Sequence, residues 1–270
     1  MLIKKIDETV SFLRNKGITE AKTGIVLGTG LGKMVKEIDI ELSINYSDIP
    51  HFPVSTVESH SGKLIYGKIG TRQVLAMQGR FHYYEGYNLA EITFPIRVMK
   101  FLGVEEVLLS NAAGALNPAY QKGSLMLLDD HINFLPDNPL RGKNYNELGP
   151  RFPDMSRPYS KKLNDMFKAK ANKRNTTLHE GVYVAFMGPN LETRAEYRMF
   201  RNFSDAVGMS TVPEVIVCNQ MSLPCAAVSV LTDECDPDNL QPANLDEILE
   251  VAGKAEVKMT ELFVDIIKEL

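Results

Sequence analysis

Cysteine is scarce in this sequence, and its arrangement excludes a familiar class of metal site. The 270 residues contain three cysteines, Cys218, Cys225 and Cys235. They form neither a Cys-x-x-Cys pair nor a Cys/His spacing typical of zinc proteins. An odd, sparse count fits a reducing compartment, so we interpret all three as small core residues.

Clusters of positive charge and long apolar runs are also missing. The 30 Lys and Arg residues and 34 Asp and Glu residues give a net charge of −4 without a basic block. This argues against nucleic acid as a main partner, because phosphate backbones are bound by clustered Lys and Arg. The amino-terminal stretch MLIKKIDETVSFLRNKG is charged throughout, unlike a secretory signal. No run approaches the roughly 18 apolar residues of a membrane span. We therefore expect a cytoplasmic protein without a membrane partner.

Short apolar segments alternate with amphipathic segments along the chain. The apolar segments predict buried strands at 24–28, 62–69, 72–78, 105–116, 123–134, 181–188 and 225–233. Helical patterns cover 2–13, 89–103, 159–172, 193–203, 213–221 and the stretch that follows Asn244. Pro95 should kink or delay the second helix. Because neither a repeat nor a low-complexity linker interrupts the pattern, we predict one α/β domain over 1–270, built on a largely buried, mixed sheet.

The segment QGRFHYYEGY, residues 78–87, combines an arginine, a histidine and four aromatic residues. Arg80 and His82 lie two positions apart, so in an extended chain both side chains point to the same face. Arginine presents a planar fork suited to phosphate oxygens, and histidine a donor that titrates near neutrality. A surface arginine beside a satisfied histidine is the alternative for this segment taken alone. His60, flanked by Ser and Gly, repeats the pattern.

Further candidates follow predicted strands at their carboxyl ends. The turn GTGLG at 28–32 contains Thr29 but is not a dinucleotide fingerprint, because position 33 is Lys. Its backbone N–H groups suit an anion. Each polar residue at a strand end is commonly only solvated. Open α/β sheets bind ligands at this edge, however. We therefore expect one shared site that includes Thr29, Arg80, Ala112, Glu192, Ser210 and Asp233.

Taken together, the motifs resemble those of the trimeric purine nucleoside phosphorylases, the family specific mainly for inosine and guanosine. The resemblance covers almost the whole chain and rests on VLGTGLG, FPVSTVESHSGKLIYG, QGRFHYYEGY, NAAGALNP, DHINF, NPLRG, RFPDMS, GPNLET, AVGMSTVPEV and ANLDEI. It implies a twisted sheet partly closed into a barrel, a homotrimer, and a role in purine salvage. The implied reaction is reversible phosphorolysis of purine (2′-deoxy)ribonucleosides to the free base and α-(deoxy)ribose 1-phosphate. Inorganic phosphate is the implied co-substrate, without a metal or organic cofactor.

The resemblance also implies roles by position. The implied phosphate site comprises Thr29, His60, Arg80, His82, the Ala112 backbone and Ser210. The implied nucleoside site comprises Tyr84 at the ribose 3′-hydroxyl, Met209 beneath the sugar, Tyr183 and Leu191 along base and sugar, and Glu192 at the Watson–Crick edge of the purine. Glu85 is placed to orient His82. Phe152, in RFPDMS, matches the aromatic residue that covers the sugar in the adjoining subunit. The catalytic candidates are His82, Glu192 and Asp233.

Two positions depart from the family pattern. Asp233 stands where an asparagine donates to the 6-oxo group and N7. Ionised, it would accept from a 6-amino group; protonated beside Glu192, it could donate. Leu245 stands where a histidine contacts the 5′-hydroxyl, so altered or apolar 5′ groups should be tolerated. Both changes lean toward the methylthioadenosine phosphorylases, whereas QGRFHYYEGY is of the purine nucleoside phosphorylase type. We expect 6-oxopurine nucleosides first and measurable adenosine cleavage; a non-catalytic nucleoside-binding protein is the remaining alternative.

Overall fold

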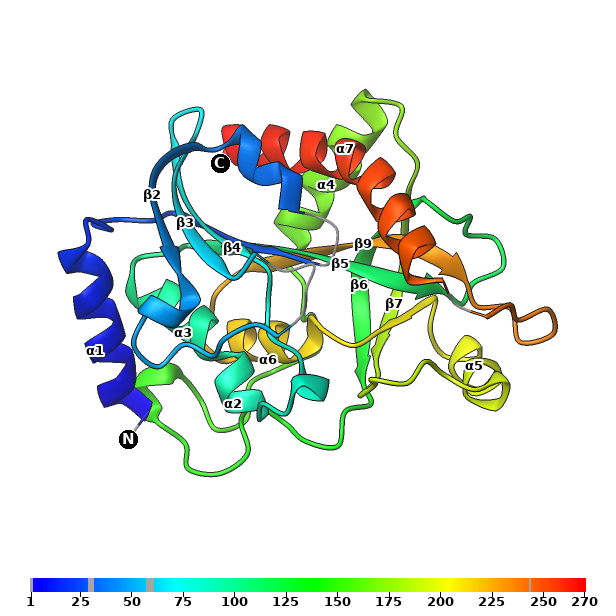
Figure 1. Ribbon diagram of the computed structural model, residues 1–270, viewed down its shortest axis with the longest axis horizontal. Coiled ribbons are helices and arrows are strands. Elements are labelled where there is room, and N and C mark those ends of the chain that lie inside the picture. Colours follow the sequence, from blue (N-terminus) through cyan, green and yellow to red (C-terminus); the bar gives the residue numbers. More distant parts are fainter. Residues whose placement is uncertain (1, 29–31, 57–60, 243) are drawn as a thin grey trace.

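The structure is a computed structural model that describes residues 2–28, 32–56, 61–242 and 244–270 (Figure 1). Its strands are β1 (Thr23–Leu27), β2 (Asp39–Asn45), β3 (Lys63–Ile69), β4 (Arg72–Gln78), β5 (Glu106–Ala115), β6 (Leu125–Asn133), β7 (Leu178–Ala185), β8 (Ala206–Gly208) and β9 (Cys225–Glu234). Its α-helices are α1 (Leu2–Asn15), α2 (Leu89–Ile92), α3 (Phe94–Phe101), α4 (Lys161–Lys173), α5 (Arg194–Arg201), α6 (Val212–Gln220) and α7 (Leu245–Glu269).

The described strands form one mixed sheet in the order β2-β3-β4-β1-β5-β8-β7-β6-β9. The central strand β1 runs parallel to both β4 and β5, whereas β3 is antiparallel to β2 and β4. β5 pairs with β9 as well as with β8, so β5, β8, β7, β6 and β9 return on themselves as a small, partly closed barrel. The predicted α/β fold with a mixed sheet partly closed into a barrel is confirmed.

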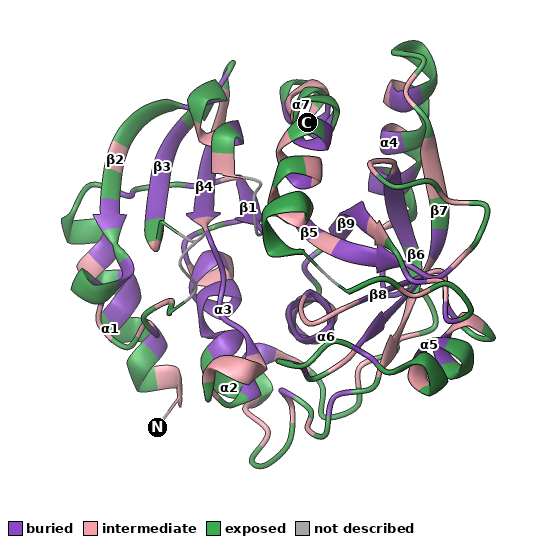
Figure 2. Cartoon of the chain, turned by 45° about the vertical axis from the view of Figure 1, so that its right-hand side comes forward, coloured by how far each residue is buried: buried purple, intermediate pink, exposed green. Residues whose placement is uncertain are grey.

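Helices cover both faces of the sheet, which explains why its central strands are apolar throughout. Side chains alternate along β1: Val26 packs in the cluster that includes α1, α3 and α6, while Ile25 and Leu27 pack in the cluster that includes α4 and α7. Figure 1 shows α4 and α7 on the side of the sheet opposite α1, α3 and α6. Figure 2 shows the same contrast in burial, with buried central strands and a largely exposed β2 at the edge.

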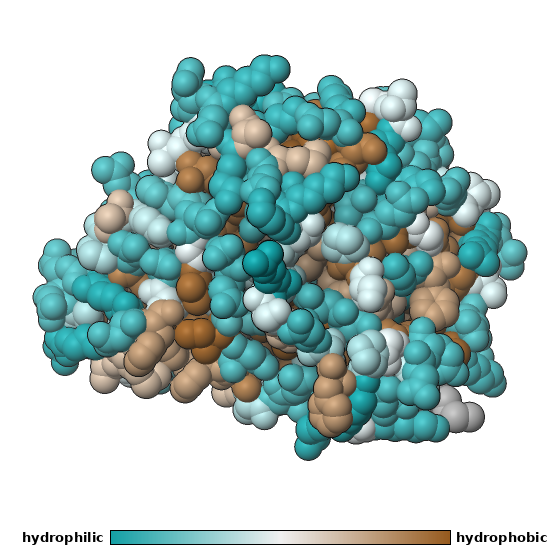
Figure 3. All heavy atoms as spheres, turned by 180° about the vertical axis from the view of Figure 1, so that it is seen from behind, coloured by the Kyte–Doolittle hydropathy of each residue, from teal (hydrophilic) through white to brown (hydrophobic). Residues whose placement is uncertain are grey.

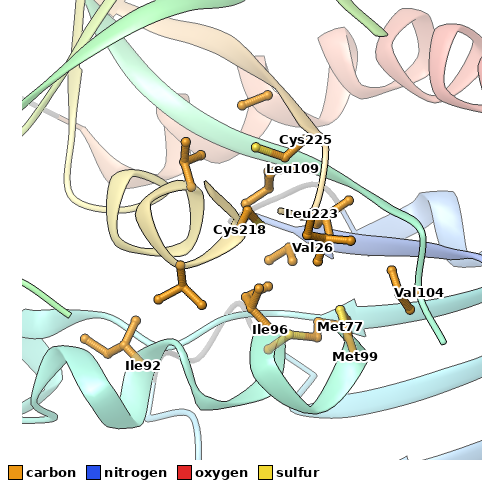
Figure 4. Close-up of a cluster of buried hydrophobic side chains, with 14 of the residues drawn as sticks. Val26, Met77, Ile92, Ile96, Met99, Val104, Leu109, Cys218, Leu223 and Cys225 are labelled. Atoms are coloured by element: carbon orange, nitrogen blue, oxygen red, sulfur yellow. The ribbon is translucent and has the colours of Figure 1, made fainter. Parts of the chain in front are cut away.

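The three cysteines belong to this core, as predicted. All are free and buried. Figure 4 shows Cys218 on α6 and Cys225 at the start of β9 beside Leu109 and Leu223. The side chains of Cys218 and Cys225 lie in contact, and that contact together with burial raises the pKa of Cys218. Thiols held in this state behave as small apolar side chains.

Most predicted elements are confirmed, with three differences. The predicted long helix at 89–103 is divided into α2 and α3 at Thr93, and Pro95 lies in the first turn of α3. The strand predicted at 181–188 begins earlier, at Leu178, because β7 pairs with β6 from that residue onward. Sequence reasoning missed β2, whose side chains are mostly exposed and polar, and the very short β8. No helix in the described ranges is long and apolar enough to cross a membrane.

Candidate active site

A cavity of about 630 Å³ opens where the carboxyl ends of β4, β5, β8 and β9 approach the first turns of α7. Its size suits a small organic ligand. Most of the predicted site residues line it: Arg80, His82, Tyr84, Ala112, Leu191, Glu192, Met209, Ser210, Asp233 and Leu245. The expectation that strand ends would bring these residues together therefore agrees with their placement.

One end of the cavity is built around a buried arginine. Arg80 follows β4 and is 1% exposed. Its Nε lies 3.2 Å from Oε1 of Glu214, on α6, and its Nη1 donates to the carbonyl of Ser110 at 2.6 Å. Nη1 also donates to Oγ of Ser210 at 3.4 Å. A guanidinium held by a carboxylate, a carbonyl and a hydroxyl has a fixed orientation, which suits recognition of an oxyanion.

His82 lies beside this arginine and is oriented by Glu85. His82 Nδ1 lies 2.9 Å from Oε1 of Glu85, whose other oxygen accepts from the backbone and side chain of Thr56 at 2.7 Å each. Burial alone would raise the pKa of Glu85, but these hydrogen bonds outweigh it and bring the pKa to about 2. Burial lowers the pKa of His82, although the bond to Glu85 opposes this. An ionised Glu85 therefore accepts a hydrogen bond from the Nδ1–H group of a neutral His82 at pH 7.

The opposite end of the cavity contains two carboxyl groups. Glu192, which follows β7, is 6% exposed, and Asp233 lies near the end of β9. Burial, with a further contribution from the charge of Asp233, raises the pKa of Glu192. Asp233 accepts from the hydroxyl of Thr232 at 2.8 Å and from the thiol of Cys235 at 3.3 Å. Because burial raises its pKa, Glu192 is protonated more readily than an ordinary carboxyl group, whereas two hydrogen-bond donors point at Asp233.

Close packing behind this pair requires a glycine. A Cβ on Gly114, in β5, would lie 2.4 Å from Sγ of Cys235 and 3.1 Å from Oδ2 of Asp233. Any side chain at this position would displace the thiol and the carboxylate. The small-residue motif NAAGAL thus makes room for the groups at the base of the cavity, as well as exposing backbone at Ala112.

The first turns of α7 add an apolar wall. Leu245, Ile248 and Leu249 line the cavity, and Leu245 is 66% exposed. The helix begins here because Oδ1 of Asn244 accepts from the backbone N–H groups of Asp246 at 3.0 Å and Glu247 at 3.3 Å. The helix predicted after Asn244 is confirmed, and this cap fixes its first turn, where Leu245, Ile248 and Leu249 line the cavity.

Two predicted site residues, Thr29 and His60, lie outside the described residues. Two others, Tyr183 and Phe152, do not line the cavity. Tyr183 lies behind the wall, where it is fully buried and its hydroxyl accepts from the backbone N–H of Ser210 at 3.3 Å. Its ring occupies the space left by the absent side chain of Gly208, so any role of Tyr183 toward base and sugar is to support the wall from behind. Phe152 is 87% exposed, in the loop between β6 and α4.

Sequence reasoning missed several residues of the site. Glu214, Asn111, Tyr197 and Cys235 come near the cavity only through tertiary packing. Glu214 carried one usable signal, because it is the only charged residue of the apolar helix VPEVIVCNQ. A lone acid in such a helix indicates a buried partner, since an unpaired buried charge is strongly unfavourable. Among the described residues, no group of three or more His, Cys, Asp or Glu side chains is arranged to hold a metal ion.

Comparisons with known proteins agree with this arrangement. Residues 22–268 match the model of the Phosphorylase superfamily. Purine nucleoside phosphorylase 1 of Geobacillus stearothermophilus is 46% identical over 266 residues, covering 98% of this chain and 97% of the relative. A solved structure of isoform 2 of purine nucleoside phosphorylase from Schistosoma mansoni, in complex with cytosine and ribose-1-phosphate, superimposes with a TM-score of 0.94. The two sequences are 38% identical, and the match covers 99% of this chain and 96% of that one. A Schistosoma mansoni purine nucleoside phosphorylase solved with adenosine has a TM-score of 0.93 at 36% identity, covering 99% and 98%.

Proposed function

We infer the reaction from a premise that these comparisons supply: this chain belongs to the purine nucleoside phosphorylases of the Phosphorylase superfamily. It is accordingly a pentosyltransferase. We propose that its substrates are purine (2′-deoxy)ribonucleosides, that inorganic phosphate is the co-substrate, and that no metal or organic cofactor takes part. The products are the free base and α-(deoxy)ribose 1-phosphate, and the reaction is reversible. The observation that carries the proposal is that the Arg80 cation and the Glu192–Asp233 pair line one cavity.

We propose that phosphate binds at the Arg80 end. Arg80, His82, Ser210 and the backbone of Ala112 would surround it, and Thr29 and His60 would complete the site. A phosphate oxygen forms the bond to C1′ as the bond from C1′ to N9 breaks, and the electron pair of that bond leaves with the purine. Phosphate attacks from the face opposite the base, so the configuration at C1′ inverts. The site contributes by holding both reactants in line and by orienting fixed donors toward the anion.

We propose that the nucleoside spans the rest of the cavity. Tyr84, Met209 and Leu191 would contact the sugar and base, with Tyr183 supporting them from behind. Glu192 and Asp233 would meet the Watson–Crick edge and N7 side of the purine. Negative charge develops on the departing base, and a hydrogen bond at N7 or the 6-substituent would stabilise it.

The 6-oxo preference expected from the family remains our first proposal, and one observation favours a second candidate. Asp233 accepts from both Thr232 and Cys235, and an acceptor at that position suits a 6-amino group. The apolar wall at Leu245, Ile248 and Leu249 suits an apolar 5′ substituent. Cleavage of adenosine or of methylthioadenosine is therefore the alternative specificity.

One assay decides among these functions. Loss of inosine, guanosine, adenosine and methylthioadenosine is measured with and without phosphate, and kcat/KM is compared. Phosphate-dependent turnover with inosine or guanosine preferred supports the first proposal, and a strong preference for methylthioadenosine supports the second. Binding without turnover of any of the four would contradict an enzymatic function and favour the nucleoside-binding alternative.

We propose a homotrimer in the cytoplasm, in which Phe152 completes the site of the neighbouring subunit. A phenylalanine side chain that is 87% exposed in one chain gains by burial against a second copy. Sedimentation should give three times the 30.2 kDa chain mass, and Phe152→Ala should raise KM for the nucleoside more than KM for phosphate. A fully active monomer would contradict this arrangement.

A further inference from the structure

Thr211 is a strained residue that lies directly behind the proposed phosphate site without contributing a contact to it. Thr211 has φ 68° and ψ −52°. The backbone N–H of Val212 donates to the carbonyl of Ser210 at 2.7 Å, which closes a three-residue turn around Thr211. This is a γ-turn with a positive central φ, the rarer and more strained of the two γ-turn forms. A β-branched residue in that conformation is an outlier even among turns.

Strain of this kind persists only where neighbouring contacts hold it in place. Thr211 is fully buried, and its hydroxyl accepts from Nδ2 of Asn111 at 2.9 Å. Asn111 is fixed in turn, because its Oδ1 accepts from the hydroxyl of Ser229 at 2.7 Å. Both partners lie on central strands, β5 and β9, that pair along their length. A series of hydrogen bonds between side chains therefore ties the turn to these two paired strands of the sheet.

The other side of the turn faces the cavity. Oγ of Ser210 lies 3.2 Å from Oγ1 of Thr211 and 3.4 Å from Nη1 of Arg80. Ser210 and Asn111 line the cavity, whereas Thr211 does not. The same turn begins α6, which carries Glu214, the carboxylate paired with Arg80. One strained residue thus adjoins two of the three groups that orient the arginine, Ser210 and Glu214.

We propose that Thr211 is a positioning residue for phosphate: its γ-turn, held by Asn111 and Ser229, aims the Ser210 hydroxyl and the Glu214 end of α6 at Arg80. The inference rests on the proposed phosphorolysis and adds a residue that touches neither reactant. A relaxed turn would leave the fold intact while moving Ser210 away from Arg80. Of the proposed nucleoside contacts, Met209 adjoins the turn, whereas Glu192, Asp233 and Leu245 lie elsewhere, so the effect should be larger for phosphate than for the nucleoside.

The test compares Thr211→Val with Thr211→Ser in steady-state kinetics with both substrates varied. Valine keeps the branched shape but removes the hydroxyl, so KM for phosphate should rise about tenfold or more, the size expected for losing a hydrogen-bonded contact to a charged site. KM for the nucleoside should rise by less than about threefold, since Met209 adjoins the turn but the other proposed nucleoside contacts lie elsewhere. Serine keeps the hydroxyl, so its KM for phosphate should stay within about threefold of the parent.

Thr93→Val is the matched control, because Thr93 is equally buried and its hydroxyl donates to the carbonyl of Leu89 at 2.7 Å, away from the cavity-lining residues. It should lower Tm without changing KM for phosphate. If Thr211→Val does not fold, Ser229→Ala decides the question: removing the group that orients Asn111 should raise KM for phosphate about threefold. An unchanged KM for phosphate in whichever variant folds, or an equal rise for both substrates, would overturn the inference. Phosphate-independent cleavage by the parent enzyme would instead overturn the proposed function.

Discussion

The two ends of the cavity are built differently. At the Arg80 end, Arg80 and His82 are almost completely buried. Each has a side-chain partner, Glu214 for Arg80 and Glu85 for His82. At the Glu192 end, Leu191 and Leu245 are largely exposed. Figure 3, a view from behind, shows hydrophilic and hydrophobic side chains intermixed on that face of the molecule. A preorganised end suits a reactant that never varies, and a more open end suits one whose substituents differ.

The charges differ as well. The Arg80 end joins a cation to a carboxylate, and the ionised Glu85 nearby is hydrogen-bonded to His82 and Thr56, so the charges there already have partners before an anion arrives. The Glu192 end places two carboxyl groups together, and burial raises the pKa of Glu192. The first arrangement fixes geometry, while the second leaves the position of a proton to be decided by the ligand. Substitutions at the two ends should therefore have different signatures: lost activity or stability at one, and altered specificity at the other.

Removing the cation should have the largest effect. Arg80→Ala should lower kcat/KM at subsaturating phosphate at least about a hundredfold, since a charge-assisted contact to the transition state contributes about 2–4 kcal/mol. Arg141→Ala is the control, because that side chain is 81% exposed. Unchanged phosphorolysis in Arg80→Ala would remove the arginine from the site.

The buried partner of Arg80 should affect stability next most strongly. Glu214→Gln keeps an acceptor but removes the charge, and breaking a buried ion pair should lower the unfolding free energy by about 3 kcal/mol in urea titrations. Glu250→Gln, at an exposed pair with Lys254, should leave the unfolding free energy nearly unchanged, because water screens that pair. Equal stability of both variants would mean that the Arg80–Glu214 pair does not hold this end rigid.

A substitution at the other end should change preference more than rate. Asp233→Asn replaces an acceptor-only group by one that can also donate, so the ratio of kcat/KM for adenosine to that for inosine should fall about tenfold. Asp236→Asn is the control for the same substitution close to the cavity but outside its lining, because Asp236 pairs with Arg201. A ratio that does not move would show that Asp233 does not contact the 6-substituent.

The smallest effect is expected at the apolar wall. Leu245→Asn should lower the ratio of kcat/KM for methylthioadenosine to that for adenosine about threefold, because a partly exposed contact with one methylthio group is lost. Val257→Asn places the same change at another exposed apolar position of α7, outside the cavity lining. An equal change of this ratio in both variants would mean that Leu245 does not contact the 5′ substituent.

Sequence reasoning identified most of the elements, because buried strands and amphipathic helices leave clear periodic patterns. It failed at β2, an exposed edge strand with a polar composition, and at β8, which is too short to carry a pattern. It located the strand ends where polar residues collect, and therefore the side chains that line the cavity. The burial of Tyr183 behind the cavity could not be predicted, since no periodicity reveals that Gly208 makes room for its ring.

The amino-acid order by itself determined the alternation of strands and helices and the sparse cysteines expected of a reducing compartment. It also contains motifs whose chemistry indicates an anion site and whose family resemblance implies a purine nucleoside. Tertiary structure alone decided that Glu214 is the partner of Arg80 and that the backbone turn at Thr211 is strained. Arg80 and Glu214 are 134 positions apart, and Asn111 and Thr211 are 100 apart. Contacts over such separations depend on how strands are ordered in the sheet, and that order is set by the packing of the whole chain rather than by any local segment.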